Sequence, residues 1–163
     1  MLINIEKQDD GSVMVFLSCT VAAPVAKIWA YLSSDDLLAE WFPELAVGEL
    51  AEHGHMLFNM LPEALVKMPI RRFKPERDLA FDWDDDLVSF YLEPMSDQET
   101  RLLFTERIGH LSDHSARDVA GWRLCLGRLK NVAEGRARDH AAESFDALVA
   151  DYRAQFSPWL PAT

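Results

Sequence analysis

The chain contains few cysteines and no long apolar run. Its two cysteines, Cys19 and Cys125, each lie inside an apolar periodic segment, so we expect both to be reduced and buried as small apolar side chains. No apolar stretch approaches the roughly 18 residues of a membrane span, and the start, MLINIEKQDDGS, lacks the basic and apolar regions of a signal peptide. We therefore expect a cytoplasmic protein.

Positive charge is also scarce. Lysine and arginine together number 16, against 27 aspartates and glutamates, which gives a formal net charge of −11. A protein of this charge is repelled by phosphate backbones and by anionic membrane surfaces. We therefore expect neither nucleic acid nor a membrane as a partner.

The sequence motifs of nucleophilic and phosphate chemistry are missing. No serine nucleophile elbow and no glycine-rich phosphate loop occur. Cys19 has no evident neighbouring cation that would lower the pKa of its thiol. The sequence thus assigns no catalytic residue and predicts no cofactor.

Two groups of residues resemble metal sites only superficially. His53 with His55, and His110 with His114, could each bind a metal together with a carboxylate, but neither pair forms a zinc pattern such as HExxH. The stretch DWDDD, residues 82–86, gathers four acids but lacks the glycine and the final glutamate of an EF-hand loop. We expect solvated turns at these positions and no metal site.

The remaining sequence predicts one domain over residues 1–163. With 49% hydrophobic and 26% charged residues, the composition is that of a globular domain large enough to bury a core. SVMVFLSCTV, residues 12–21, alternates as a strand does, and LINIEK, residues 2–7, could pair with it across a turn.

Two short amphipathic helices are predicted after this strand. Pro24 suits the first turn of one helix, whose apolar residues recur at helical spacing through Trp29. Ser33 and Ser34 offer an N-cap, with Asp36 three residues after Ser33 as in a capping box, for a second helix that continues to Trp41.

Six further strands follow, and a long helix comes after them. The strands are separated by short polar turns such as Pro62-Glu63 and Pro75-Glu76, as antiparallel hairpins require. We therefore predict an α+β, helix-grip fold: a curved seven-stranded antiparallel sheet wrapped around a long C-terminal helix, with two short helices between strands 1 and 2. The six strands are VGELAE, HMLFNM, LVKMPIRRF, LAFDWD, LVSFYLEP and ETRLLFTERIG.

The long helix is predicted from a wide apolar stripe that reaches Ala133. Ser115 and Asp118 would form the capping box at its start. Gly121 and Gly127 interrupt the helix, each at a cost of about 1 kcal/mol relative to alanine. Either another segment approaches closely at these glycines, or they leave room for a ligand.

Four segments carry a family resemblance: TVAAPVAKIWAYLSSDDLLAEWFP, FKPERDLAFDWDD, SFYLEPMSDQETRLLFTERI and AGWRLCLGRLKNVAEG. In their order and spacing they resemble the family named for activators of heat-shock protein 90 ATPase, within the START-like and birch-pollen-allergen-like superfamily called SRPBCC. The resemblance implies an apolar cavity between the sheet and the long helix. Relatives include binders of lipid-like or polyphenolic molecules, aromatase/cyclase enzymes and eukaryotic co-chaperones.

Candidate binding residues follow from the predicted sheet face. Alternation places Glu106 on the apolar face, where a carboxylate is costly unless it is paired, protonated or hydrated. It could anchor a ligand or act as a general acid or base, or it could pair with Arg72 or with an arginine of the long helix. We expect Trp29 in the core, and Trp41 with Phe42 at the cavity mouth. The residues expected to bind the ligand are Trp41, Phe42, Phe58, Met68, Phe81, Trp83, Phe90, Phe104, Glu106 and Trp122.

Three functions stay open at this point. The first, which we prefer, is binding of a hydrophobic or aromatic small molecule in the cavity, with Glu106 orienting it. The second is a co-chaperone-like module that binds a protein such as a chaperone. The third is a cyclase-like or hydrolase-like enzyme that uses Glu106 with a histidine of the loop 110–114. A homodimer also stays open.

Overall fold

The structure, a computed structural model, describes residues 1–60 and 64–160. The predicted turn at Pro62-Glu63 lies outside the described residues. The strands are β1 (Leu2–Lys7), β2 (Val13–Val21), β3 (Leu45–Glu49), β4 (His55–Met60), β5 (Ala64–Lys74), β6 (Asp78–Trp83), β7 (Asp86–Ser96) and β8 (Glu99–Ile108). The helices are α1 (Val25–Ser33), α2 (Asp35–Leu38), α3 (Asp113–Ala133) and α4 (Phe145–Phe156), and a 3-10 turn, η1, covers Ser157–Trp159.

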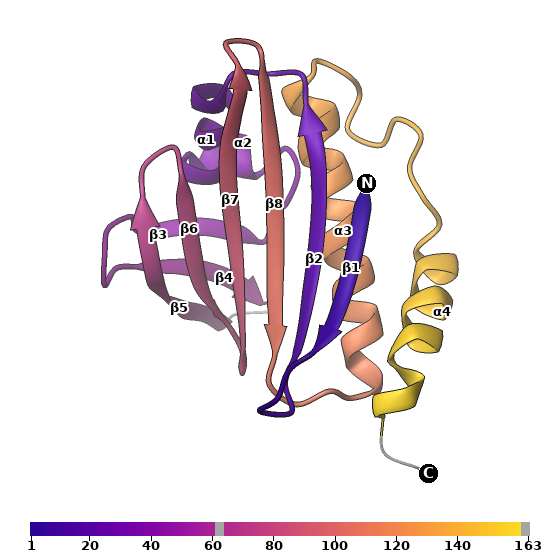
Figure 1. The fold of residues 1–163 in the computed structure, drawn as a ribbon. Coiled ribbons are helices and arrows are strands. Elements are labelled where there is room, and N and C mark those ends of the chain that lie inside the picture. Colours follow the sequence, from indigo (N-terminus) through magenta and orange to yellow (C-terminus); the bar gives the residue numbers. More distant parts are fainter. Residues whose placement is uncertain (61–63, 161–163) are drawn as a thin grey trace.

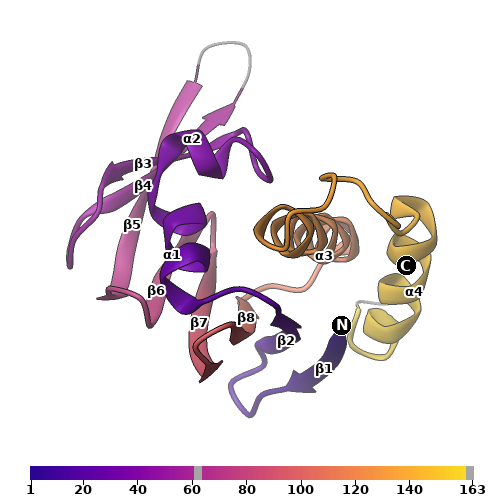
Figure 2. The same cartoon turned by 90° about the horizontal axis from the view of Figure 1, so that it is seen from above.

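All the described strands belong to one antiparallel sheet with the order β1-β2-β8-β7-β6-β5-β4-β3. The register of β5 against β6 shifts between Ile70 and Arg72, and such a bulge bends and twists a strand. Seen from above, the sheet curves so that α1, α2 and α3 lie on its inner side (Figure 2). The antiparallel sheet and its long helix agree with the predicted α+β class (Figure 1).

The predicted number of strands was wrong, because β1 is an eighth strand. It pairs with β2 along its whole length, from Leu2 opposite Ser18 to Lys7 opposite Val13. Only Ile3 and Ile5 of β1 pack against the core, so this edge strand has a weak apolar pattern. The two short helices consequently lie between β2 and β3, and not between the first two strands.

The predicted N-cap of the long helix is displaced by three residues, whereas that of the short helix α2 is one of the two serines expected. Ser112 is the N-cap of α3, and the Ser115 hydroxyl accepts a hydrogen bond from the Ser112 N–H at 3.0 Å, which leaves Asp118 free for other contacts. For α2, Ser34 is the N-cap, without a side-chain capping bond, and the capping box expected from Ser33 does not form because the Ser33 hydroxyl donates to the Trp29 carbonyl at 2.7 Å. A serine hydroxyl can donate or accept, so the sequence pattern alone did not distinguish Ser112 from Ser115.

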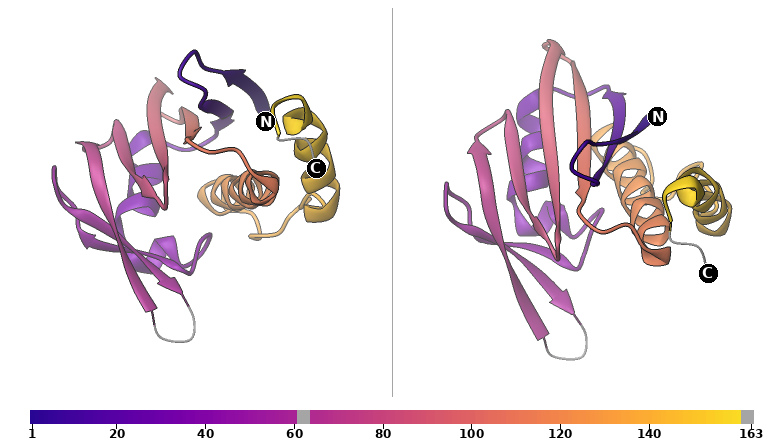
Figure 3. Two further views of the ribbon diagram at one scale, coloured as in Figure 1. Left: turned by 90° about the horizontal axis from the view of Figure 1, so that it is seen from below. Right: turned by 60° about the horizontal axis from the view of Figure 1, so that its bottom comes forward.

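Helix α3 is covered on two sides. Its inner face buries Val119, Leu126 and Leu129 against the sheet, and its outer face packs against α4 (Figure 3). Arg123 donates to the Tyr152 hydroxyl at 3.1 Å across the α3–α4 contact. No helix within the described part of the chain is long and apolar enough to cross a membrane.

Candidate functional site

A cluster of aromatic rings fills the space between the sheet and α3. The Trp122 ring is central: its centroid lies 4.9 Å from that of Phe104, 4.9 Å from that of Trp83 and 5.3 Å from that of Phe42. Tilted and edge-on pairs of this kind are favourable beyond their buried area. Predicted site residues therefore pack mainly against one another. The cluster comprises Trp41, Phe42, Phe58, Phe81, Trp83, Phe90, Phe104 and Trp122.

Trp41 does not lie at a cavity mouth as predicted, and Trp29 is less buried than predicted. Trp41 is fully buried, and its Nε1 donates to the Tyr31 carbonyl at 2.9 Å. Trp29 is only half-buried and packs against Phe73, with 5.9 Å between the ring centroids. The reason is that α2 ends at Leu38, so Trp41 lies in the following turn, which directs it inward.

Met68, which was also predicted to bind the ligand, lies in the core. It is 4% exposed on β5 and lies opposite Met56 of β4. Phe58, on the same strand as Met56, is half-buried and packs edge-on against Trp83 at 5.1 Å. Met68 and Met56 are thus part of the buried core, and Phe58 is part of the aromatic cluster.

An open recess of about 340 Å³ lies at the edge of the aromatic cluster. Three predicted site residues line it, namely Phe42, Trp83 and Trp122. Its other lining residues come from α3, from the segment after α2 and from the start of α4; they are Glu44, His114, Arg117, Asp118, Gly121, Cys125 and Phe145. The recess is thus lined by both aromatic and charged side chains.

Gly121 leaves part of this recess open. A Cβ atom added at Gly121 would meet no atom within 4 Å, and the same holds for Gly127. Close approach of another segment therefore does not account for either glycine. The structure therefore favours the other interpretation of these glycines, which is that they leave open space beside the helix.

Three carboxyl groups meet next to the recess. Asp86 begins β7, Glu106 lies on β8 and Asp118 lies on α3, and one oxygen of each lies within 4.8 Å of the others. Asp118 Oδ1 accepts from Trp83 Nε1 at 2.9 Å, and Asp86 Oδ1 accepts from the Gly109 N–H at 3.1 Å. We call these three residues the carboxyl trio.

Glu106 is the buried member of the carboxyl trio. It is 0% exposed, as alternation along its strand predicted. Burial raises the pKa of Glu106 well above its ordinary value of 4.5, and the neighbouring Asp118 and Asp86 raise it further. Burial is also the main cause that raises the pKa of Asp86. The trio therefore favours either a bound proton or a bound cation.

The expected ion pair of Glu106 with an arginine does not form among the described residues. Arg72 Nε pairs instead with Asp78 at 2.9 Å. Two arginines of α3 also have other partners: Arg123 pairs with Glu143 at 2.8 Å, and Arg128 pairs with Asp139 at 2.8 Å. Glu106 thus lies beside two other carboxyl groups, whereas the sequence suggested an arginine as its partner.

Asp118 and Asp86 were missed as site residues by the sequence analysis. Asp118 lies four residues before Trp122, which places both on one face of the helix, so this spacing could have indicated Asp118. Asp86 belongs to the acidic stretch predicted as a solvated turn, and only the pairing of β7 with β8 brings it to Glu106. No local pattern reveals that second contact.

The histidines do not contribute to the carboxyl trio. Within residues 1–60 and 64–160, the only group of three metal-ligating side chains is the trio itself, and it contains no histidine. His114 lines the recess, whereas His110 is exposed in the loop before α3. Neither Glu106 oxygen has a hydrogen-bond partner among the described residues, so the acid–base pair expected of Glu106 and a histidine is not formed there.

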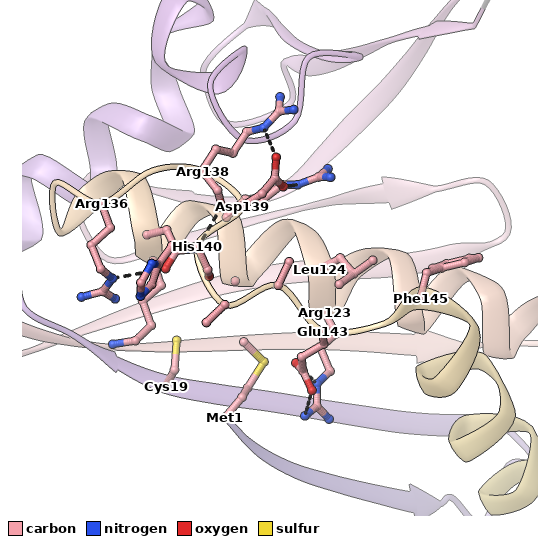
Figure 4. A pocket seen from close by; sticks show the side chains of 16 residues that line it. Met1, Cys19, Arg123, Leu124, Arg136, Arg138, Asp139, His140, Glu143 and Phe145 are labelled. Carbon is pink, nitrogen blue, oxygen red and sulfur yellow. Dashed lines mark hydrogen bonds and ion pairs between the residues drawn. The ribbon is translucent and has the colours of Figure 1, made fainter.

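A second pocket, of about 470 Å³, lies between α3 and the segment that leads to α4 (Figure 4). Its charged groups are largely paired with one another, as the contacts of Arg123 with Glu143 and of Arg138 with Asp139 show. None of the predicted site residues lines it. The recess beside Trp122 is accordingly the better candidate site.

Comparison with known proteins agrees with this architecture. The model of the family described as "Activator of Hsp90 ATPase homolog 1-like protein" matches residues 22–134, more than half of the chain. The chain belongs to this family. The Hsp90 ATPase activator homologue family lies in the SRPBCC helix-grip superfamily, so the resemblance noted in the sequence is confirmed. No curated protein matches the chain.

Solved structures share the family fold. The conserved protein of unknown function EF2215 from Enterococcus faecalis is 28% identical, with a TM-score of 0.86 over 96% of this chain and 91% of its own. CalU16 from Micromonospora echinospora is 19% identical, with a TM-score of 0.68 over 96% and 92%. The Aha1 dimer from Colwellia psychrerythraea is 20% identical, with a TM-score of 0.63 over 74% and 96%.

Proposed function

We propose that this member of the Hsp90 ATPase activator homologue family binds a hydrophobic or aromatic small molecule in the recess beside Trp122, in the cytoplasm. The observation that carries the proposal is the recess itself, in which aromatic walls and the Asp118 carboxylate lie side by side. Sites for small molecules are typically apolar hollows with a few polar groups that fix orientation. The predicted role of Glu106 is then indirect, because it contacts the ligand's anchor, Asp118.

The size of the recess limits the ligand. About 340 Å³ lies near the lower end of the range found for small-molecule sites. Trp83 and Trp122 offer ring faces and edges against which one or two aromatic rings can pack. Asp118 is an acceptor when ionised, so the best ligand carries a hydroxyl or an amine at one end.

A ligand panel tests this function. Purified protein is screened by thermal shift against one- and two-ring aromatic compounds, each with and without a hydroxyl or amine group. We expect stabilisation by the substituted compounds, a change in tryptophan fluorescence and a weaker response in Asp118→Asn. If no compound raises the melting temperature and native mass spectrometry finds no bound molecule, the proposal fails.

The alternatives are less well supported. The Colwellia structure is described as an Aha1 dimer, so a homodimer or a partner such as a chaperone is a reasonable second proposal. Sedimentation equilibrium of this chain tests it, since a monomer at micromolar concentration would exclude a stable homodimer. The enzyme alternative has lost its expected histidine partner, because the described neighbours of Glu106 are Asp86 and Asp118.

A further inference from the structure

We infer that Asp86, Glu106 and Asp118 form a binding site for a hard divalent cation, with Ca²⁺ as the best match. The three residues come from β7, β8 and α3, and they approach one another only in the folded chain. The site lies next to the recess and shares Asp118 with it, but the inference does not depend on the proposed function.

The buried member of the trio points to a ligand. Glu106 is 0% exposed, and neither of its carboxylate oxygens accepts a hydrogen bond from the described residues. A carboxyl group buried in this way normally has hydrogen-bond donors or a counter-charge. One Glu106 oxygen lies within 4.8 Å of an oxygen of Asp86 and of an oxygen of Asp118. It is therefore available as a ligand to a cation held by the trio.

The described part of the chain supplies no positive charge to the trio. None of the described ion pairs includes Asp86, Glu106 or Asp118. The nearest arginines along the sequence have other contacts: Arg107 pairs with Asp10, and the Arg117 guanidinium lies 5.3 Å from the Phe145 ring centroid. The negative charge of the trio thus forms no ion pair with the described residues.

A single proton would neutralise only part of this charge. With Glu106 protonated, Asp86 and Asp118 would still face each other, and Asp84 adds a further negative charge close to Asp86. A divalent cation offsets two charges at once and draws the three oxygens together. The arrangement of four acids therefore favours a cation over a proton alone.

The donor atoms and their spacing indicate the type of cation. All three are carboxylate oxygens, which suit Ca²⁺, Mg²⁺ or Mn²⁺ and not a soft metal. The trio oxygens lie within 4.8 Å of one another, so a single ion can contact all three. Ca²⁺ is the best match because it accepts flexible oxygen geometry, whereas Mg²⁺ demands a near-ideal octahedron. Waters would complete the coordination, because the two aspartates are only half-buried.

A bound cation would join the sheet to the long helix. Asp86 and Glu106 belong to neighbouring strands, whereas Asp118 belongs to α3. Because the unfolded chain does not hold these residues together, cation binding should stabilise the folded state.

The experiment uses the full chain, first freed of metal with EDTA and then titrated with Ca²⁺, Mg²⁺ or Mn²⁺. We expect one Ca²⁺ per chain by calorimetry, and a melting temperature raised by about 5 to 10 °C at a hundredfold excess over Kd. Tb³⁺, a luminescent substitute for Ca²⁺, should show emission excited through the indole of Trp83, which hydrogen-bonds Asp118.

Two variants complete the test. Glu106→Gln should fold, because it removes a buried charge, but it should lose the Ca²⁺ shift and the Tb³⁺ emission. Glu99→Gln, on the same strand as Glu106, removes an exposed acid outside the trio and should retain both. The inference is overturned if none of the three cations changes the melting temperature, or if Tb³⁺ emission is equal in Glu106→Gln and the unchanged chain; Glu106 would then hold a proton.

Discussion

Trp83 Nε1 donates a hydrogen bond to Asp118 Oδ1 at 2.9 Å, and this contact links the end of β6 to the long helix. The Trp83 ring also lines the recess and packs against Trp122, with 4.9 Å between the ring centroids. One side chain therefore forms an apolar wall of the candidate site and orients its carboxylate. The aromatic cluster and the carboxyl trio are connected through this residue.

Trp83→Phe should destabilise the protein by about 1 to 3 kcal/mol, because it removes the hydrogen-bond donor from a half-buried carboxylate. Urea unfolding measures the change. The matched control is Trp29→Phe, since Trp29 is also half-buried and its Nε1 makes no hydrogen bond to the described residues. Equal losses of stability in the two variants would show that the Asp118 contact contributes nothing.

Gly121→Ala and Gly127→Ala should each stabilise the protein by up to about 1 kcal/mol. Alanine favours the helix, and a Cβ atom at either position meets no atom within 4 Å. Chemical denaturation of both variants checks this expectation. A loss of stability at Gly121 alone would mean that the recess is narrower than the structure indicates.

Glu106→Gln should change how stability depends on pH in protein kept free of divalent cations. The raised pKa means that folded Glu106 holds its proton more tightly than the unfolded chain does. The free energy of unfolding should therefore fall as pH rises from the ordinary value of 4.5 through the folded pKa. Asp86, whose pKa is also raised, adds a change of the same sign.

The comparison is made by denaturation at several pH values. The variant lacks the Glu106 contribution, so its advantage over the unchanged chain should grow as pH rises. Glu99→Gln is the control, because Glu99 is exposed on the same strand. If the stability difference between Glu106→Gln and the unchanged chain stays constant with pH, or grows as pH falls, the raised pKa of Glu106 is contradicted.

Most of the fold could be predicted because alternation is strong in the inner strands. The six strands after the short helices all appear close to their predicted bounds. The edge strand β1 was not counted, because only Ile3 and Ile5 contribute to its apolar side. The other residues of β1 are exposed, so its apolar pattern carries less information than that of the other strands.

The candidate site could be predicted only in part. Period-2 alternation was enough to predict that Glu106 is buried, because this pattern can be read within a single strand. The partners of Glu106 depend on strand pairing and on the packing of α3, which no single segment encodes. Trp41 was misplaced for a similar reason: α2 ends three residues earlier, and the turn sets its direction.

The central claim is that the recess beside Trp122 binds an aromatic molecule, and filling that recess tests it most directly. Gly121→Leu extends a side chain into the recess, whereas Gly127→Leu makes the same change in the second pocket, on the same helix. The measurement is the affinity of the best compound from the panel for both folded variants. We predict at least about a tenfold loss for Gly121→Leu, with little change for Gly127→Leu. Equal affinity in both variants would place the ligand elsewhere and contradict the account.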